Sequence, residues 1–363
     1  MTALLSPLAL RGLTLKNRLV VSPLCQYSAR GGVVGDYHLV HLGRFALGGF
    51  GTVIVEATAV TAQGRITYGC PGLWEDGQIA GMARITALLR AQGAVAGIQL
   101  AHAGRKASSI PPWLIGTDER EADAEHWQPV APSALPHAED APVPRAMTEA
   151  DIGAEVEAWT AATRRAVKAG FHLIEIHAAH GYLLNQFLSP VSNRREDAYG
   201  GSAANRMRFP LQVVEAVRAA MPGDMPLAVR LSASDGLEGG RTVEDSIVFA
   251  RALRERGVDV IDVSAGGFTG ARFEIGPGMY LPWATQIRQA AGLPVMAVGL
   301  MGEAQLAEAA MAEERADLVA LGRAALDDPN WPLHAARRLG AETRALWPKQ
   351  AGYAIERWPG RNR

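Results

Sequence analysis

The chain has 363 residues, of which 48% are hydrophobic and 20% are charged, and its formal net charge is −1. This composition is ordinary for a globular protein, and the small net charge excludes the global field that draws a protein to nucleic acid or to a membrane surface. No apolar run is long enough to span a bilayer. Two cysteines, Cys25 and Cys70, are too few for a disulfide framework. Because the N-terminus also lacks the basic start and cleavage site of a signal peptide, we expect a cytoplasmic protein.

Short apolar runs rich in β-branched residues alternate with amphipathic segments along the chain. The runs predicted to be strands lie at 18–24, 52–58, 95–101, 172–178, 226–232, 258–264, 293–299 and 316–322. Helical patterns between them include 151–170, 205–221, 243–257 and 304–314. Near-continuous apolar strands that alternate with helices indicate a parallel sheet covered on both faces. Eight such units predict a (β/α)8 (TIM) barrel that forms a single domain over residues 1–363.

A doubly wound open sheet is the alternative to the barrel. Such a sheet requires a glycine-rich turn after its first strand, and residues 23–28 read PLCQYS instead. The barrel carries three predicted additions. Residues 1–17 include a hairpin that caps the barrel floor, 341–363 form a C-terminal extension, and 103–147 form a long Pro-rich connection. Loops of that length are uncommon and often functional, so 103–147 is either a lid or a surface excursion without a role.

The sequence His-Ala-Ala-His-Gly-Tyr at 177–182 follows a predicted strand directly. In a (β/α)8 barrel the active site lies at the C-terminal ends of the strands. Two imidazoles three residues apart, His177 and His180, can converge on one polar group, and the phenol of Tyr182 can deliver a proton beside it. This arrangement suits the polarisation of a carbonyl and protonation next to it. The alternative is that all three are ordinary surface residues of a loop.

The last two predicted strands end in glycines that suit a phosphate. Gly299 and Gly322 allow close approach of the backbone, and Arg323 adds a guanidinium with the fork geometry that phosphate prefers. The loops after these two strands are the usual phosphate site of a barrel. A phosphorylated cofactor is therefore expected, and the alternative is that the glycines only turn the chain.

Arg230 lies within a predicted buried strand. An unpaired buried charge is costly, so the guanidinium must meet an anion. Either Arg230 forms a salt bridge with Glu175 or Asp262, or it faces a cofactor that becomes negative on reduction.

Residues 177–209, HAAHGYLLNQFLSPVSNRREDAYGGSAANRMRF, resemble the signature of the old yellow enzyme family, which comprises flavin-dependent ene reductases on a (β/α)8 barrel. Further segments of the chain resemble other blocks of that family, and they lie at 17–28, 55–65, 99–106 and 297–332. Cys25 and Tyr27 resemble the pattern of the smaller bacterial branch, which includes xenobiotic reductases and thermophile-type enzymes. The resemblance implies bound FMN as the only redox centre, with NADPH or NADH as the hydride donor.

The resemblance also implies which residues contact the cofactor. Arg230 would face N1 and C2=O of the flavin and stabilise its reduced anion, and Cys25 would tune its potential. A small buried hydrophobe is the alternative for Cys25. The flavin ring would be lined by Pro23, Leu24, Ala57 and Gln99, and its phosphate would be held by Gly299, Gly322 and Arg323.

For the substrate, the resemblance implies that His177 and His180 bind a carbonyl or nitro oxygen. Hydride would pass from the flavin to Cβ of an activated alkene, and Tyr182 would protonate Cα. Tyr27 would line the opposite wall. Enones, maleimides, nitroesters and quinones would all satisfy the two histidines.

The C-terminal residues Arg357 and Trp358 resemble an element of the smaller branch in which a C-terminal arginine reaches the active site of a neighbouring subunit. A homodimer or homotetramer is therefore expected. The alternative is a frayed tail, the usual state of a terminus.

Two other functions compete with ene reduction. A metal-dependent barrel hydrolase could use His177, His180 and Glu175 as ligands, although no His-x-His pair follows the first strand. A flavin-binding redox protein without ene reductase activity would need no proton donor such as Tyr182. A Schiff-base aldolase is disfavoured because none of the four lysines falls at a predicted strand end.

Overall fold

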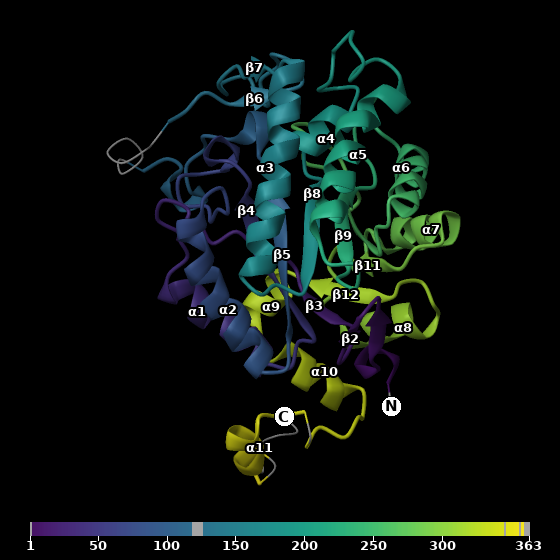
Figure 1. Ribbon diagram of the computed structural model, residues 1–363. Helices are drawn as coiled ribbons and strands as arrows, with labels where there is room; N and C mark the ends of the chain where they lie inside the picture. Colours follow the sequence, from purple (N-terminus) through teal and green to yellow (C-terminus); the bar gives the residue numbers. More distant parts are fainter. Residues whose placement is uncertain (1, 118–125, 345, 356, 359–363) are drawn as a thin grey trace.

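The computed structural model describes residues 2–117, 126–344, 346–355 and 357–358. Eight parallel strands close into a barrel in the order β10-β11-β12-β3-β4-β5-β8-β9, so the predicted (β/α)8 architecture is confirmed (Figure 1). The barrel strands are β3 (Leu19–Val21), β4 (Thr52–Ala59), β5 (Val95–Ala101), β8 (Leu173–Ala178), β9 (Leu227–Ser232), β10 (Val260–Ser264), β11 (Val295–Ala297) and β12 (Leu318–Leu321).

Helices surround the barrel, and two of the longest begin with capping boxes. Thr148 and Thr242 each accept a hydrogen bond from the backbone N–H three residues on, and the aspartate there accepts one from the backbone N–H of the threonine. The α-helices are α1 (Asp36–Leu47), α2 (Ile79–Ala91), α3 (Glu149–Lys168), α4 (Leu183–Leu188), α5 (Ala203–Ala220), α6 (Val243–Glu255), α7 (Leu281–Ala291), α8 (Ala304–Ala312), α9 (Arg323–Asp327), α10 (Trp331–Arg338) and α11 (Lys349–Ile355). The 3₁₀ turns are η1 (Ala3–Leu5), η2 (Ala62–Gly64), η3 (Asp76–Gln78), η4 (Gly104–Lys106) and η5 (Pro112–Leu114).

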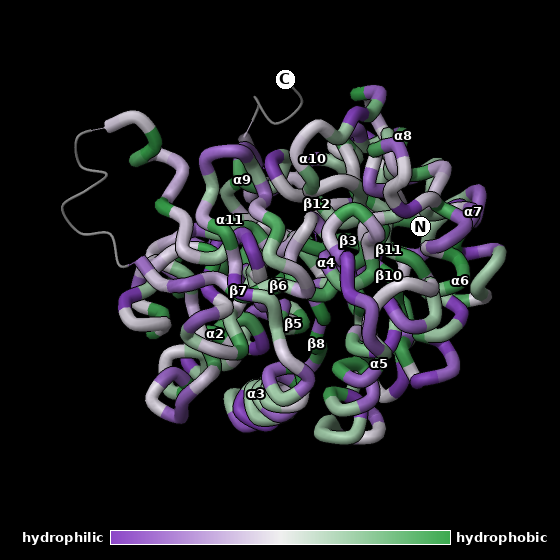
Figure 2. Tube along the Cα trace, turned by 90° about the horizontal axis from the view of Figure 1, so that it is seen from above, coloured by the Kyte–Doolittle hydropathy of each residue, from purple (hydrophilic) through white to green (hydrophobic). Residues whose placement is uncertain are grey.

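The apolar core has a larger part, a smaller part and a third, minor cluster near the active site, and Figure 2 shows hydrophobic segments gathered toward the centre. The larger part lies between helices and strands and includes the fully buried Trp159, Phe209 and Phe249. The smaller part fills the lower barrel interior, where the hairpin of β1 (Leu8–Leu10) and β2 (Leu13–Leu15) closes the floor. None of the helices that the structure describes is long and apolar enough to cross a membrane.

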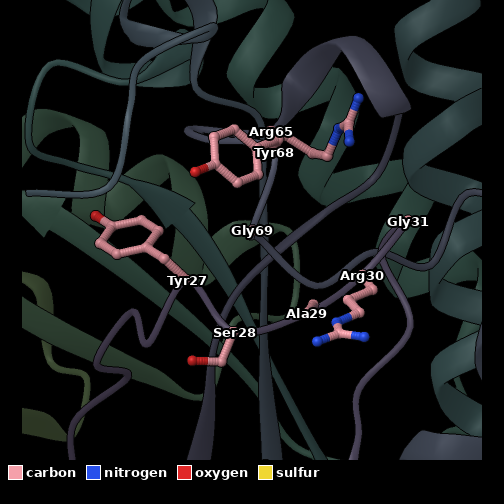
Figure 3. Close-up of a pocket in the computed structure, with 8 residues that line it drawn as sticks. All are labelled: Tyr27, Ser28, Ala29, Arg30, Gly31, Arg65, Tyr68 and Gly69. Atoms are coloured by element: carbon pink, nitrogen blue, oxygen red, sulfur yellow. The ribbon is translucent and has the colours of Figure 1, made fainter. Parts of the chain in front are cut away.

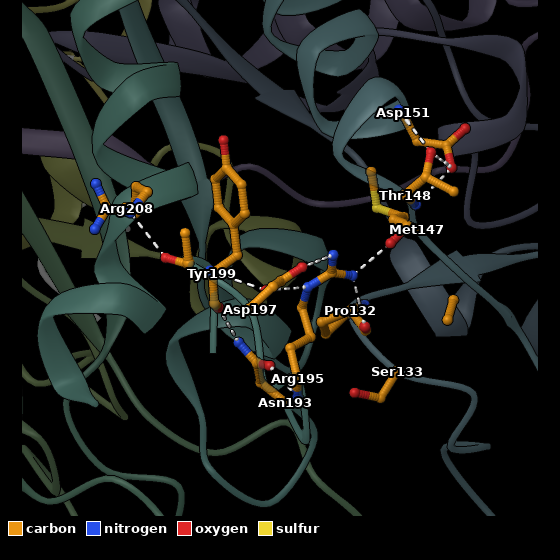
Figure 4. Close-up of polar contacts among 12 residues, drawn as sticks. Pro132, Ser133, Met147, Thr148, Asp151, Asn193, Arg195, Asp197, Tyr199 and Arg208 are labelled. Atoms are coloured by element: carbon orange, nitrogen blue, oxygen red, sulfur yellow. Dashed lines mark hydrogen bonds and ion pairs between the residues drawn. The ribbon is translucent and has the colours of Figure 1, made fainter. Parts of the chain in front are cut away.

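The described part of the long connection after β5 is attached to the loop that follows α4. This connection contains the two-stranded pair β6 (Val130–Ala131) and β7 (Arg145–Ala146). Arg195 donates hydrogen bonds to the backbone oxygens of Pro132 and Met147 and pairs with Asp197 (Figure 4). The guanidinium therefore holds the β6–β7 pair beside the C-terminal ends of the strands.

The C-terminal helix α11 lies at the opposite end of the molecule from β6 and β7 (Figure 1). Arg357 and Trp358 follow it there, and their backbone N–H groups bond to Ala354 and Ile355. The Trp358 side chain is 60% exposed. These two residues therefore lie far from the C-terminal ends of the strands in their own barrel.

Candidate active site

A left-handed turn presents the two histidines and the tyrosine at the end of β8. His180 (φ 58°) and Gly181 (φ 69°) both have positive φ, which costs a non-glycine residue free energy. The turn is held because the His180 N–H donates to Ser232 Oγ at 2.9 Å and the Gly181 N–H donates to Asn185 Oδ1 at 2.7 Å. A side chain at position 181 would collide with the Gly267 carbonyl oxygen, which lies 2.4 Å from an ideal Cβ.

The rings of His177, His180 and Tyr182 are in contact. The His177 ring centre lies 5.1 Å from that of His180 and 4.9 Å from that of Tyr182. His177 Nδ1 accepts a hydrogen bond from the Ala179 N–H at 3.3 Å, which leaves the ring proton on Nε2 as a donor. His180 Nε2 lies 2.7 Å from Ser264 Oγ. His177 thus offers a free N–H, whereas the Nε2 atom of His180 has a serine partner.

The environment keeps all three side chains neutral. Burial, and then the charge of Arg230, lowers the pKa of His177 and His180 well below the ordinary value. Burial raises the pKa of Tyr182 above the ordinary value for a phenol. The histidines are therefore hydrogen-bonding groups without a net charge, and Tyr182 keeps its proton.

Cys25, Tyr27 and Tyr182 pack against one small apolar cluster that includes Ala57 and Ala101. Burial, and then the nearby Glu56 carboxylate, raises the pKa of the Cys25 thiol, so Cys25 is protonated and not a thiolate nucleophile. Tyr27 also borders a neighbouring cavity of about 440 Å³. Figure 3 shows the hydroxyls of Tyr27 and Tyr68 on one side of that cavity and the guanidinium of Arg30 on another.

A second cavity of about 490 Å³ lies over the ends of β11, β12 and β3. Its lining includes these residues named from the sequence: Pro23, Leu24, Arg230, Gly299, Gly322 and Arg323. Gly299 has a φ of 94°, and a Cβ there would lie 2.8 Å from the Tyr280 ring. A cavity lined by two guanidiniums and by close-approaching backbone fits a phosphorylated cofactor. Tyr280 and Met301 also line it, and no strand-end pattern in the sequence singled them out.

Arg230 forms one of the salt bridges considered from the sequence, and it also borders the second cavity. Its Nε lies 3.3 Å from Asp262 Oδ2, and its side chain remains 11% exposed where it borders the cavity. Gln99 lies deeper, where its Nε2 donates to Glu175 Oε1 at 2.8 Å. The salt bridge to Asp262 is therefore present, and it leaves Arg230 able to face a ligand as well.

Lys106 is a site residue that the strand-end analysis missed. It lies in η4, five residues after β5, and its ammonium donates to the carbonyl oxygens of His180, at 2.8 Å, and Gly267. The ammonium also lies 5.4 Å from the centre of the Tyr182 ring. Burial, and then Arg105, lowers the pKa of Lys106 to about 8. One cation thus joins the loops after β5, β8 and β10.

The predicted hydrolase ligands do not form a metal centre here. Within the described ranges, no group of three or more His, Cys, Asp or Glu side chains is placed to hold a metal ion. Glu175 is instead bonded to Gln99 inside the barrel. Arg357 and Trp358 lie at the other end of the molecule from this site.

Replacing Lys106 with methionine removes the ammonium that joins the loop after β8 to the loop after β10. We expect amide hydrogen exchange across 180–182 and 266–268 to accelerate, and stability to fall by about 1.5–3 kcal/mol for each charge-assisted hydrogen bond lost. Lys168→Met, at an exposed lysine on α3, is the matched control. Exchange unchanged in Lys106→Met relative to this control would contradict the role given to Lys106.

Comparison with known proteins identifies the family. Residues 3–342 match the model of the NADH:flavin oxidoreductase / NADH oxidase family. An NADPH dehydrogenase of Geobacillus thermodenitrificans is 48% identical over 354 residues, which cover 97% of this chain and 99% of the relative. Morphinone reductase is 31% identical with a TM-score of 0.78 and covers 97% and 95% of the two chains. The old yellow enzyme homologue from Zymomonas mobilis is 26% identical, with a TM-score of 0.74 and coverage of 96% and 98%. The chain therefore belongs to the NADH:flavin oxidoreductase / NADH oxidase family in its old yellow enzyme form, and it is an FMN-dependent oxidoreductase that takes its electrons from NADPH or NADH.

Proposed function

We propose that the enzyme reduces the activated C=C bond of α,β-unsaturated carbonyl or nitro compounds. The observation that carries this proposal is the contact of the Tyr182 phenol with the neutral imidazole of His177, beside His180. A hydrogen-bond donor for an oxygen and a proton donor for an adjacent carbon are the two groups that such a reduction requires.

His177 binds the substrate oxygen through its free Nε2 proton in this proposal. His180 contributes when the oxygen displaces Ser264 from its ring nitrogen. Both rings are neutral, so they stabilise charge that develops on the oxygen without binding a resting anion as strongly as a cation would. Donors that act on developing charge lower the barrier more than they strengthen ground-state binding.

Tyr182 supplies the proton to Cα. Burial raises its pKa, so the phenol is protonated across the physiological range and releases its proton only when a carbanion-like carbon forms beside it. In this proposal the ammonium of Lys106, 5.4 Å from the centre of the Tyr182 ring, favours the phenolate left behind.

FMN supplies the hydride acceptor and donor when it is bound. We assign its phosphate to Gly299, Gly322 and Arg323, and its ring to Arg230 with Pro23, Leu24, Ala57 and Gln99 at its borders. The glycine cradle at Gly299 and the half-paired guanidinium of Arg230 support this assignment. Cys25 contributes a neutral thiol, and Tyr27 forms the wall opposite Tyr182.

A flavin-binding redox protein without ene reductase activity is the second candidate. Such a protein has no use for a proton donor held beside two hydrogen-bonding imidazoles.

A cytoplasmic location fits the two free cysteines.

The Tyr182→Phe variant separates these candidates. It should bind FMN and oxidise NADPH as the native enzyme does, whereas turnover of 2-cyclohexenone should fall by about 10²–10⁴-fold because the proton donor is lost. Stopped-flow measurement of each half-reaction tests this. Tyr199→Phe, outside the site, is the control. Enone turnover in Tyr182→Phe equal to that of the control would remove Tyr182 from its role.

We also propose that the C-terminal segment of one subunit completes the site of another in a homodimer or homotetramer. Arg357 and the exposed Trp358 lie far from the strand ends of their own barrel, so they can reach a site only on a neighbouring copy. An exposed indole beside an arginine is a pair of side chains common at interfaces.

Deletion of 352–363 removes Arg357 and Trp358 and should raise the KM for enones, because the site loses part of its wall. Deletion of 359–363 keeps both residues and serves as the control. Steady-state kinetics and sedimentation velocity measure the two effects. An unchanged KM in the longer deletion would exclude the proposed contribution.

A further inference from the structure

We propose that Glu175 and Asp262 share a single proton inside the barrel, and that this proton keeps Arg230 free to support negative charge on the flavin. The two acids are positioning residues: they act on the cofactor through Arg230 and touch no substrate. The proposal rests on FMN binding beside Arg230, and its first test below does not need the cofactor.

The strand register brings the three charged residues together. Asp262 on β10 is paired in register with Arg230 on β9, and Arg230 is paired with His177 on β8. Glu175 precedes His177 by two residues, so both side chains point to the same face of β8. Gln99 on β5 is in register with Glu175. Of the three charged residues, Arg230 lines the cavity over the strand ends, whereas neither acid does.

Both acids are sealed from solvent, and three of their four carboxyl oxygens lack a hydrogen-bond donor in the part of the chain that the structure describes. Glu175 and Asp262 are 0% exposed. Glu175 Oε1 accepts from Gln99, but Glu175 Oε2 and both carboxylate oxygens of Asp262 have no hydrogen-bond partner among the residues described. Arg230 Nε lies 3.3 Å from Asp262 without forming a hydrogen bond. Buried oxygens without donors are costly, and a proton on one acid turns the contact between the two carboxyls into a hydrogen bond.

The charge balance requires the same proton. Two carboxylates and one guanidinium would bury a net charge of −1, whereas one shared proton makes the cluster neutral. Two close buried carboxyls do not both ionise readily. Burial, and then the charge of Asp262, raises the pKa of Glu175. Burial raises the pKa of Asp262 as well, but the charge of Arg230 and the hydrogen bond with Glu175 both act to lower it. The proton is therefore assigned to Glu175, and the negative charge to Asp262.

The surrounding groups leave this balance in place. Glu175 is influenced by Asp262, Arg230 and Gln99, and Asp262 by Arg230 and Glu175. His177 and His180 also face Arg230, and both are neutral. The phenol of Tyr280, also influenced by Arg230, has a raised pKa and is neutral too.

The shared proton has a consequence for the cofactor. While Glu175 is protonated, the charge of Arg230 is offset by Asp262 alone, and the cluster does not oppose negative charge on the flavin ring. As pH rises through the raised pKa of Glu175, the cluster gains a negative charge. The reduced cofactor is then destabilised, and its midpoint potential falls more steeply with pH.

Infrared spectroscopy of the FMN-free protein tests the proton directly. We expect carbonyl stretches of protonated buried carboxyls at neutral pH, one component of which disappears in Glu175→Gln and persists in the control Glu56→Gln, which alters a second buried acid whose pKa is raised by burial. In the native protein the band should titrate away above neutral pH. A band that is absent at neutral pH, or whose intensity is unchanged in Glu175→Gln, would overturn the proposal.

Potentiometry of the FMN-bound protein tests the consequence. Glu175→Gln mimics the protonated acid, so its midpoint potential at neutral pH should equal that of the native protein, without the steeper fall at higher pH. The double variant Glu175→Gln/Asp262→Asn leaves Arg230 uncompensated. Compared with the native protein, it should favour reduced over oxidised FMN by at least a further tenfold. This corresponds to a midpoint potential about 30 mV higher for a two-electron couple.

If Glu175→Gln alone raised the midpoint potential by the same amount, about 30 mV, both acids would be ionised in the native protein and the shared proton would be refuted. If the protein bound no FMN, the proposed function would fail, while the infrared band would still decide the state of the pair.

Discussion

A guanidinium inside the mouth of a barrel determines the electrostatics of this site. Arg230 is held in place because it lies within strand β9, and its charge affects the neighbouring titratable groups. It contributes to the low pKa of His177 and His180 and pairs with Asp262. The same cation borders the cofactor cavity. One buried charge therefore pairs with an acid, makes a cavity suited to an anion, and adds to the effect of burial that keeps the two imidazoles neutral.

The rigidity of the rim depends on backbone contacts that only glycine permits. Gly181 and Gly267 let the loops after β8 and β10 touch, and Lys106 bonds a carbonyl oxygen from each loop. The left-handed His180 is held at the centre of this arrangement. A site that must place a hydrogen-bond donor and a proton donor on neighbouring atoms requires such fixed geometry. The β6–β7 pair beside the strand ends is held separately by Arg195, which donates hydrogen bonds to two backbone oxygens next to these strands.

Much of this could be predicted from the sequence because strands and their ends carry local signals. The eight apolar runs match the eight barrel strands, although the run at 293–299 gives only Val295–Ala297 because the chain turns at Gly299. The positions of His177, His180 and Tyr182, and of the cavity-lining Gly299 and Gly322, could be predicted because a parallel barrel gathers the C-terminal ends of its strands at one rim.

The rest depends on tertiary contacts that have no local signature. Lys106 lies in a loop, and its importance arises from carbonyls 74 and 161 residues further along the chain. The hydrogen bond between His180 and Ser264 joins the loop after β8 to the end of β10, and no local pattern favours it over a bond to substrate. The contact of Glu175 with Asp262 likewise depends on barrel register.

The central claim is that this barrel transfers hydride from a nicotinamide cofactor through FMN to an activated alkene. An anaerobic absorption titration of the purified protein tests it most directly, with NADPH added first and 2-cyclohexenone second. We predict a flavin band that bleaches with NADPH and returns in full with the enone. A band that bleaches but does not return would contradict ene reduction, and a protein that stays colourless after addition of FMN would contradict the cofactor assignment itself.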